Sequence, residues 1–93
     1  QALQSLYGKR LVKLVLFGSH ARNEATPDSD IDVLVVLIEM KSPVDEIKRT
    51  TDIEVQLLLK HNELISVVPM TQHDFLYRDS PLLLNIHREG ILV

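Results

Sequence analysis

Two aspartates, Asp30 and Asp32, alternate at the start of an apolar, β-branched run, and the dipeptide Gly18-Ser19 ends the apolar run before it. Alternate residues of a strand point to the same face, so the two carboxylates would lie about 6 to 7 Å apart on one side. Such a pair can ligate Mg²⁺, which needs few protein carboxylates because water and substrate phosphates supply its other ligands. Aspartates that open a strand are also often merely solvated, so the pair alone is modest support for a metal site.

The Gly18-Ser19 turn has the chemistry of a phosphate-binding turn. Gly18 allows the backbone to approach an anion closely, because no Cβ intervenes. Ser19 can offer its hydroxyl and amide at the start of the next helix, where free N–H groups favour phosphate. Gly-Ser dipeptides also occur in ordinary turns, and Ser19 could serve only as a helix cap. The pattern becomes specific through the two aspartates, which follow Ser19 after ten intervening residues.

Extended to G-S-x-A-R and S-D-x-D, the motif resembles that of the minimal nucleotidyltransferases (MNT type) of the DNA polymerase β-like superfamily. The family pattern is Gly-Ser, ten residues, then Asp-x-Asp. The motif covers about a quarter of the chain, and the order of elements around it agrees with the family over most of the rest. The resemblance therefore implies a nucleotidyltransferase of polymerase β-like fold.

The resemblance also implies a reaction and a set of site residues. An acceptor oxygen would attack the α-phosphate of a nucleoside triphosphate, with ATP expected, and pyrophosphate would leave. Two Mg²⁺ ions would activate the nucleophile and hold the attacking and leaving oxygens. Asp30 and Asp32 would be the catalytic and metal-binding residues, and Gly18, Ser19 and Arg22 would bind phosphate. For Arg22, a solvated surface position is an equal alternative.

Active members of the superfamily carry a third carboxylate on a neighbouring strand, and here the chain departs from the pattern. If 64–68 is that strand, its corresponding residue is Ser66, which cannot act as an anionic ligand or general base. One Mg²⁺ ion in place of two would then be expected. Three acids stay open as replacements. Glu63 lies at the entrance of this strand, and Asp52 and Glu54 lie in a segment whose alternation also suits a strand.

Apolar runs separated by caps and turns indicate the elements that must position these residues. Ser42-Pro43, with acids in the next turn, starts a helix, and Asn62 can end it in a left-handed conformation. Alternation between 52 and 59 also suits a strand, but length and flanking signals favour the helix. One face of this helix would be formed by Val44, Ile47, Thr51, Val55 and Leu58. We expect strands over 11–17, 31–38, 64–70 and 91–93, and the remaining helices over 2–7, 19–25, 71–77 and 82–89.

These elements predict an α/β (α+β) fold, a small mixed sheet of three to four strands with helices packed on one face. The run 31–38 is apolar on both faces after the aspartates, which favours a central position in the sheet. A chain of 93 residues allows one small domain, over 1–93, without room for a second core.

Charge and composition restrict the function classes. A net charge of -3 and a pI near 5.7 argue against stable nucleic-acid binding, which usually needs a basic surface. The absence of cysteine excludes disulfides and thiolate metal sites. The apolar runs are too short to span a membrane and no secretory signal opens the chain, so we expect a cytoplasmic protein. We also expect residues before Gln1, and the apolar C-terminal stretch hints at a homo-oligomer.

Two hypotheses of different class follow. The first is an enzyme that transfers AMP from ATP to an acceptor, expected to be a protein because the chain has no domain for a large substrate. The second is a catalytically weakened interaction module that acts as an antitoxin. The resemblance implies a HEPN-type ribonuclease partner, and antitoxins of this type can modify their toxin with AMP, so the two hypotheses overlap.

Overall fold

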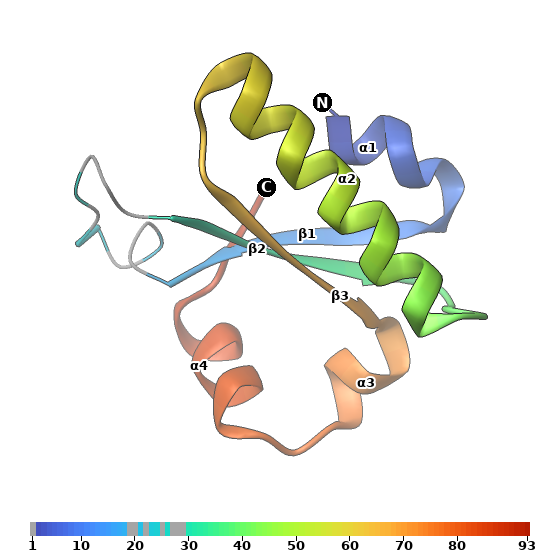
Figure 1. Ribbon diagram of the computed structural model, residues 1–93. Coiled ribbons are helices and arrows are strands. Elements are labelled where there is room, and N and C mark those ends of the chain that lie inside the picture. Colours follow the sequence, from blue (N-terminus) through green and yellow to red (C-terminus); the bar gives the residue numbers. More distant parts are fainter. Residues whose placement is uncertain (1, 19–20, 22, 25, 27–29) are drawn as a thin grey trace.

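The computed structural model describes residues 2–18, 21, 23–24, 26 and 30–93. Within this part of the chain, four strands form one mixed sheet in the order β3-β2-β1-β4 (Figure 1). Strand β2 is antiparallel to β1 and parallel to β3, and the short β4 pairs antiparallel with the outer edge of β1. The strands are β1 (Leu11–Phe17), β2 (Ile31–Leu37), β3 (Ile65–Thr71) and β4 (Ile91–Leu92).

Helices cover both faces of this sheet (Figure 1), so the predicted fold class is confirmed but the expectation of helices on one face is wrong. One face carries α1 and α2, and the other carries α3 and α4. A central strand that is apolar on both sides requires cover on both sides, which is the physical reason for two layers. The helical elements are α1 (Ala2–Tyr7), the 3₁₀ turn η1 (Gly8–Arg10), α2 (Pro43–His61), α3 (Gln72–Tyr77) and α4 (Pro81–Glu89).

Strand β2 divides the core into two clusters, because its successive side chains point to opposite faces. Five consecutive residues, 33–37, are buried, which confirms the central position predicted for this strand. The cluster below α1 and α2 contains Tyr7, Leu14, Val33, Val35, Leu37 and Val67. The cluster above α3 and α4 contains Val15, Leu34, Val36, Met70, Phe75, Leu83 and Ile86.

The ends of α2 follow the capping signals of the sequence. Ser42 accepts a hydrogen bond from the Asp45 amide at 3.4 Å, and Pro43 occupies the first turn. Asn62 ends the helix with φ of 54°, in the left-handed region. The helix predicted over 43–61 is therefore confirmed, and the alternative strand over 52–59 is wrong.

The remaining elements agree with the expected ranges to within a residue or two, except the helix expected over 19–25, which lies largely outside the described residues. Thr71 and Ser80 cap α3 and α4 by accepting backbone hydrogen bonds, as their positions in the sequence predict. None of the helices in the described ranges is long and apolar enough to cross a bilayer.

Candidate functional site

The candidate site lies at the end of the sheet where β1 stops and β2 begins. Asp32 pairs in register with Phe17, the last residue of β1, and Gly18 follows immediately. Gly18 has φ of +76°, a conformation that L side chains rarely adopt, and a Cβ built there would overlap the Asp32 carboxylate. Glycine at this position therefore serves both the turn and the close packing of the backbone against that carboxylate.

Asp30 and Asp32 lie at the start of β2. Asp30 directly precedes the strand and is exposed, whereas Asp32 is half-buried. Alternation places Asp32 on the same face as Leu34 and Val36, which pack in the cluster above α3 and α4. The carboxylate pair predicted from the sequence is thus located on the α4 side, beside the Gly18 turn.

Ser66 lies directly opposite Asp32. Strands β2 and β3 run in parallel with a constant register, which pairs these two residues. Ser66 is half-buried and shares the face of Val68, as Asp32 shares that of Leu34. The expected place of Ser66 on the strand beside Asp32 is confirmed, and its correspondence to the family's third carboxylate stays a prediction. In the described part of the chain, no group of three acidic, histidine or cysteine side chains is placed to hold a metal ion.

Two of the three acids considered as replacements, Asp52 and Glu54, lie on α2, which covers the other side of the sheet. Asp52 is exposed on α2, and Glu54 Oε1 accepts a hydrogen bond at 2.8 Å from the backbone N–H of Val67. Glu63 lies with Glu54 in a groove of about 210 Å³ between α2 and the start of β3. Because α2 covers the face opposite to Asp32 (Figure 1), Asp52 and Glu54 lie away from the candidate site. Among the described residues, Glu63 forms no three-residue metal site with Asp30 and Asp32.

A cavity of about 190 Å³ adjoins Gly18 and is lined by α4, a helix that the sequence motif does not include. Asn85 and Glu89 lie one helical turn apart on α4 and contribute the polar side chains of this cavity. The sequence did carry a signal for these two residues. With Leu82 and Ile86 they follow a spacing of three, one and three residues, which places all four on one face of the helix. The full lining is Phe17, Gly18, Leu82, Asn85, Ile86 and Glu89.

Three residues of the motif, Ser19, Arg22 and Ser29, lie outside the described residues. The phosphate-binding roles expected of Ser19 and Arg22 therefore stay predictions. Of the motif residues that the structure describes, Gly18 lies against the Asp32 carboxylate, and the Ala21 amide donates a hydrogen bond to the Gly18 carbonyl at 3.1 Å.

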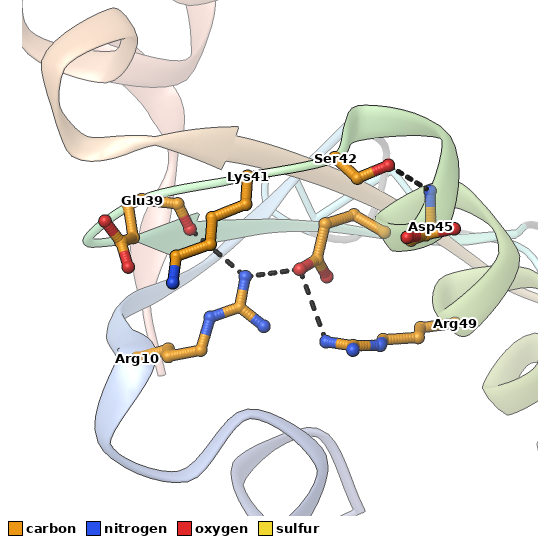
Figure 2. A pocket seen from close by; sticks show the side chains of 7 residues that line it. Arg10, Glu39, Lys41, Ser42, Asp45 and Arg49 are labelled. Atoms are coloured by element: carbon orange, nitrogen blue, oxygen red, sulfur yellow. Dashed lines mark hydrogen bonds and ion pairs between the residues drawn. The ribbon is translucent and has the colours of Figure 1, made fainter.

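A second, larger cavity of about 320 Å³ lies at the opposite end of the sheet, where β1 begins and β2 ends (Figure 2). Its centre is the buried carboxylate of Glu46, which pairs with the Arg10 guanidinium and, at 3.4 Å, with Arg49. Arg10 also donates to the Glu39 carbonyl at 3.1 Å. Burial, and then the Glu46 charge, raise the pKa of the adjacent Tyr7. These mixed charges attach α2 to the N-terminal part of the chain.

Comparison with known proteins identifies the family. Residues 1–82 match the model of the nucleotidyltransferase domain family. A protein of Methanocaldococcus jannaschii that carries the provisional name protein adenylyltransferase is 38% identical over 74 residues, which cover 80% of this chain and 68% of that protein. A second protein of the same organism and provisional name is 30% identical over 88 residues, covering 92% of this chain and 60% of its own length. The chain thus spans about two thirds of the length of these relatives.

Solved structures share the fold. A toxin–antitoxin structure with AMP-PNP superposes with a TM-score of 0.70 at 16% identity and covers 98% of this chain and 66% of its own. The structure of a Sulfolobus solfataricus protein provisionally named a nucleotidyltransferase has a TM-score of 0.62 at 17% identity, covering 97% of this chain and 70% of its own. The family match over most of the sequence and the curated relatives lead to one conclusion: the chain belongs to the nucleotidyltransferase domain family.

Proposed function

We propose that this chain binds ATP with Mg²⁺ and transfers AMP to a hydroxyl group of a protein acceptor. The observation that carries the proposal is the packing of Gly18 against the Asp32 carboxylate, next to a cavity, at the strand ends where the motif predicts the site. Curated relatives provisionally named protein adenylyltransferases support the choice of AMP and of a protein acceptor. ATP use also favours a cytoplasmic location.

The residues present fit a magnesium ion. Asp30 and Asp32 offer carboxylate oxygens on one face, where the exposure of Asp30 leaves room for water and phosphate ligands. When bound, Mg²⁺ would polarise the phosphate and offset the charge that develops on it. Gly18 keeps the backbone close to Asp32, and Ser19 and Arg22 are proposed to bind the phosphates.

The adjoining cavity is smaller than the roughly 300–1,000 Å³ of sites that enclose a whole drug-sized ligand. Only part of a nucleotide would therefore enter it, with Asn85 and Glu89 as its polar partners. Neutral Asn85 can donate and accept hydrogen bonds, as recognition of a ribose or base requires.

Transfer would form a bond between the acceptor oxygen and the α-phosphorus and break the bond to the β-phosphate, releasing pyrophosphate. The acceptor hydroxyl must also lose its proton. Ser66 has no basicity near neutral pH, so it cannot take that proton in the place of the family's third carboxylate. We therefore propose slow transfer with nucleotide binding retained, the proton passing to water or to a base of the acceptor.

The pairing of Ser66 with Asp32 also favours a second candidate function, a catalytically weakened antitoxin. In that case the chain would act by binding a HEPN-type ribonuclease. The toxin–antitoxin assemblies among the structures of the same fold support this alternative.

Intact-mass analysis after incubation with ATP and Mg²⁺ tests the proposal, using the chain and the product of a neighbouring gene. Addition of one AMP group by the unaltered chain, lost in Asp30→Asn and Asp32→Asn, is expected. Asp79→Asn, at an exposed position between α3 and α4, is the matched control and should retain transfer. ATP binding without any adduct, together with a stable complex, would support the weakened antitoxin, and failure to bind ATP would refute both the enzyme and its nucleotide site.

A further inference from the structure

A stripe of exposed, mostly apolar residues runs along α2 from Val44 to Leu58. We call this surface the α2 stripe. Its aliphatic members are exposed by 62% at Val44, 57% at Ile47, 47% at Val55 and 40% at Leu58, with Thr51 exposed at the centre. At 1.5 Å per residue, the 19 residues of α2 extend over about 28 Å. An apolar stripe of this length on a surface helix indicates a contact with another protein.

The side of α2 that faces the sheet carries polar residues, whereas an amphipathic helix usually packs apolar residues there. Its fully buried residues are Glu46 and Thr50, and Glu54 bonds to the backbone of β3. Ile53 is the α2 residue that packs, partly buried, against the core cluster on this face. Helices of globular proteins usually turn their apolar face to the core. Here the larger apolar face points away from it, so the internal fold of this chain does not account for the stripe.

The spacing of the stripe is symmetric. The intervals between its five members are three, four, four and three residues, so the positions read the same in both directions from Thr51. A second copy of α2 laid antiparallel, with Thr51 facing Thr51, would place Val44 against Leu58 and Ile47 against Val55. This is the self-complementarity required by a two-fold symmetric interface. The Thr51 hydroxyl already donates to the Ile47 carbonyl at 2.9 Å, which leaves the threonine methyl group for that contact.

The charges beside the stripe are complementary in the same arrangement. Lys48 and Asp52 are exposed and lie one turn apart on the same flank of the stripe. In an antiparallel pair, equal flanks of the two helices face each other. Lys48 of each copy would therefore lie near Asp52 of the other, and the symmetry forms this ion pair twice.

We propose that the α2 stripe is the interface of a symmetric dimer of this chain, formed by two antiparallel α2 helices. The apolar surface continues into the groove between α2 and β3, where Leu64 is 51% exposed. The groove enlarges the apolar surface that a second copy could bury, and a specific interface needs roughly 1,000 Å² of buried surface. The proposal is independent of the nucleotidyl-transfer chemistry, because Asp32 lies on the opposite face of the sheet.

Sedimentation equilibrium of the 93-residue chain across micromolar concentrations tests the dimer. A mass of about twice 10.6 kDa is expected for the unaltered chain. Ile47→Lys should raise the dimer dissociation constant by at least about 100-fold, because symmetry applies the loss of apolar burial twice. Leu84→Lys on α4, where the leucine is 59% exposed, is the matched control and should leave the dimer intact. A chain that stays monomeric, or a dimer insensitive to Ile47→Lys, would overturn the proposal.

Two further measurements test the antiparallel arrangement. Lys48→Asp and Asp52→Lys should each weaken the dimer, and the double variant should restore it because the ion pair is only reversed. The chain has no cysteine, so Thr51→Cys introduces one thiol per copy on the symmetry axis. Mild oxidation should cross-link Thr51→Cys far faster than Gln56→Cys, an exposed position off the stripe. Equal cross-linking rates, or a stripe that binds only a different protein, would refute the second copy as occupant.

Discussion

Replacing Gly18 with alanine tests the packing that places the Asp32 carboxylate. The substitution has two separable effects: an L residue must adopt φ of +76°, and its Cβ must displace the Asp32 side chain. Gly8 isolates the first effect, because it has φ of +56° and open space where a Cβ would be. We expect Gly8→Ala to lower the free energy of unfolding by about 1–2 kcal/mol, the cost of a left-handed conformation. Gly18→Ala should cost about 1–3 kcal/mol more, as overpacking does.

Urea denaturation of the metal-free and nucleotide-free chain measures both variants against the unaltered protein. A double-mutant cycle with Asp32→Ala then isolates the contact, because the truncated side chain removes the atoms that the new Cβ would overlap. The expected coupling is about 1–3 kcal/mol, with Gly18→Ala less harmful when Asp32 is absent. Titration of ATP with Mg²⁺ should show weaker binding for Gly18→Ala but not for Gly8→Ala. Equal losses for the two glycines, or a coupling near zero, would refute the packing argument.

Three further changes have defined outcomes. Glu54→Ala should destabilise the chain by about 1–3 kcal/mol in urea denaturation, since the buried Val67 N–H loses its acceptor, whereas Glu54→Gln should retain most of the stability. The pKa of Tyr7 is raised above 10.0 in the folded chain, so its contribution to the free energy of unfolding is complete below pH 10 and is lost as pH rises through the folded pKa. Tyr7→Phe should therefore flatten the decline of the unfolding free energy at alkaline pH. Ser66→Asp should lower the melting temperature of the metal-free chain, because two carboxylates then face each other. Mg²⁺ should raise the melting temperature of this variant more than that of the unaltered chain. The same Mg²⁺ response in both chains would show that Ser66 is not beside the metal site.

The sequence was sufficient for the elements whose signals are local. The cap at Ser42, the left-handed Asn62 and the apolar run of β2 each specify their structure through nearby residues, and all are confirmed. The position of Ser66 opposite Asp32 was also predictable, because it needs only the strand pairing of the family fold. A central strand that is apolar on both sides needs helices on both faces of the sheet. The expectation that helices cover one face did not take this into account.

Contacts between distant parts of the chain were not accessible in this way. Glu46 reads as a first-turn acid that suits the helix dipole, yet it is buried with Arg10, which is 36 residues away in the sequence. Asn85 and Glu89 read as ordinary polar residues of α4 until the packing of that helix beside Gly18 brings them to the cavity. Local periodicity can assign a residue to a helix face, but only tertiary packing decides what that face meets.

The orientation of α2 shows this limit and its consequence together. Its apolar periodicity correctly indicated a helix and grouped Ile47 with Val55, but periodicity cannot say whether such a face points to the core or to solvent. That choice was made by two polar contacts, Glu46 with Arg10 at the start of the helix and Glu54 with the β3 backbone further along. Turning the acidic face outward would take the carboxylate acceptors away from Arg10 and from the buried Val67 N–H, and buried groups left without partners are costly, so these contacts hold the acidic face inward. The apolar stripe then faces solvent because of the way the helix is attached, which leaves it available to the second copy of α2 that we propose.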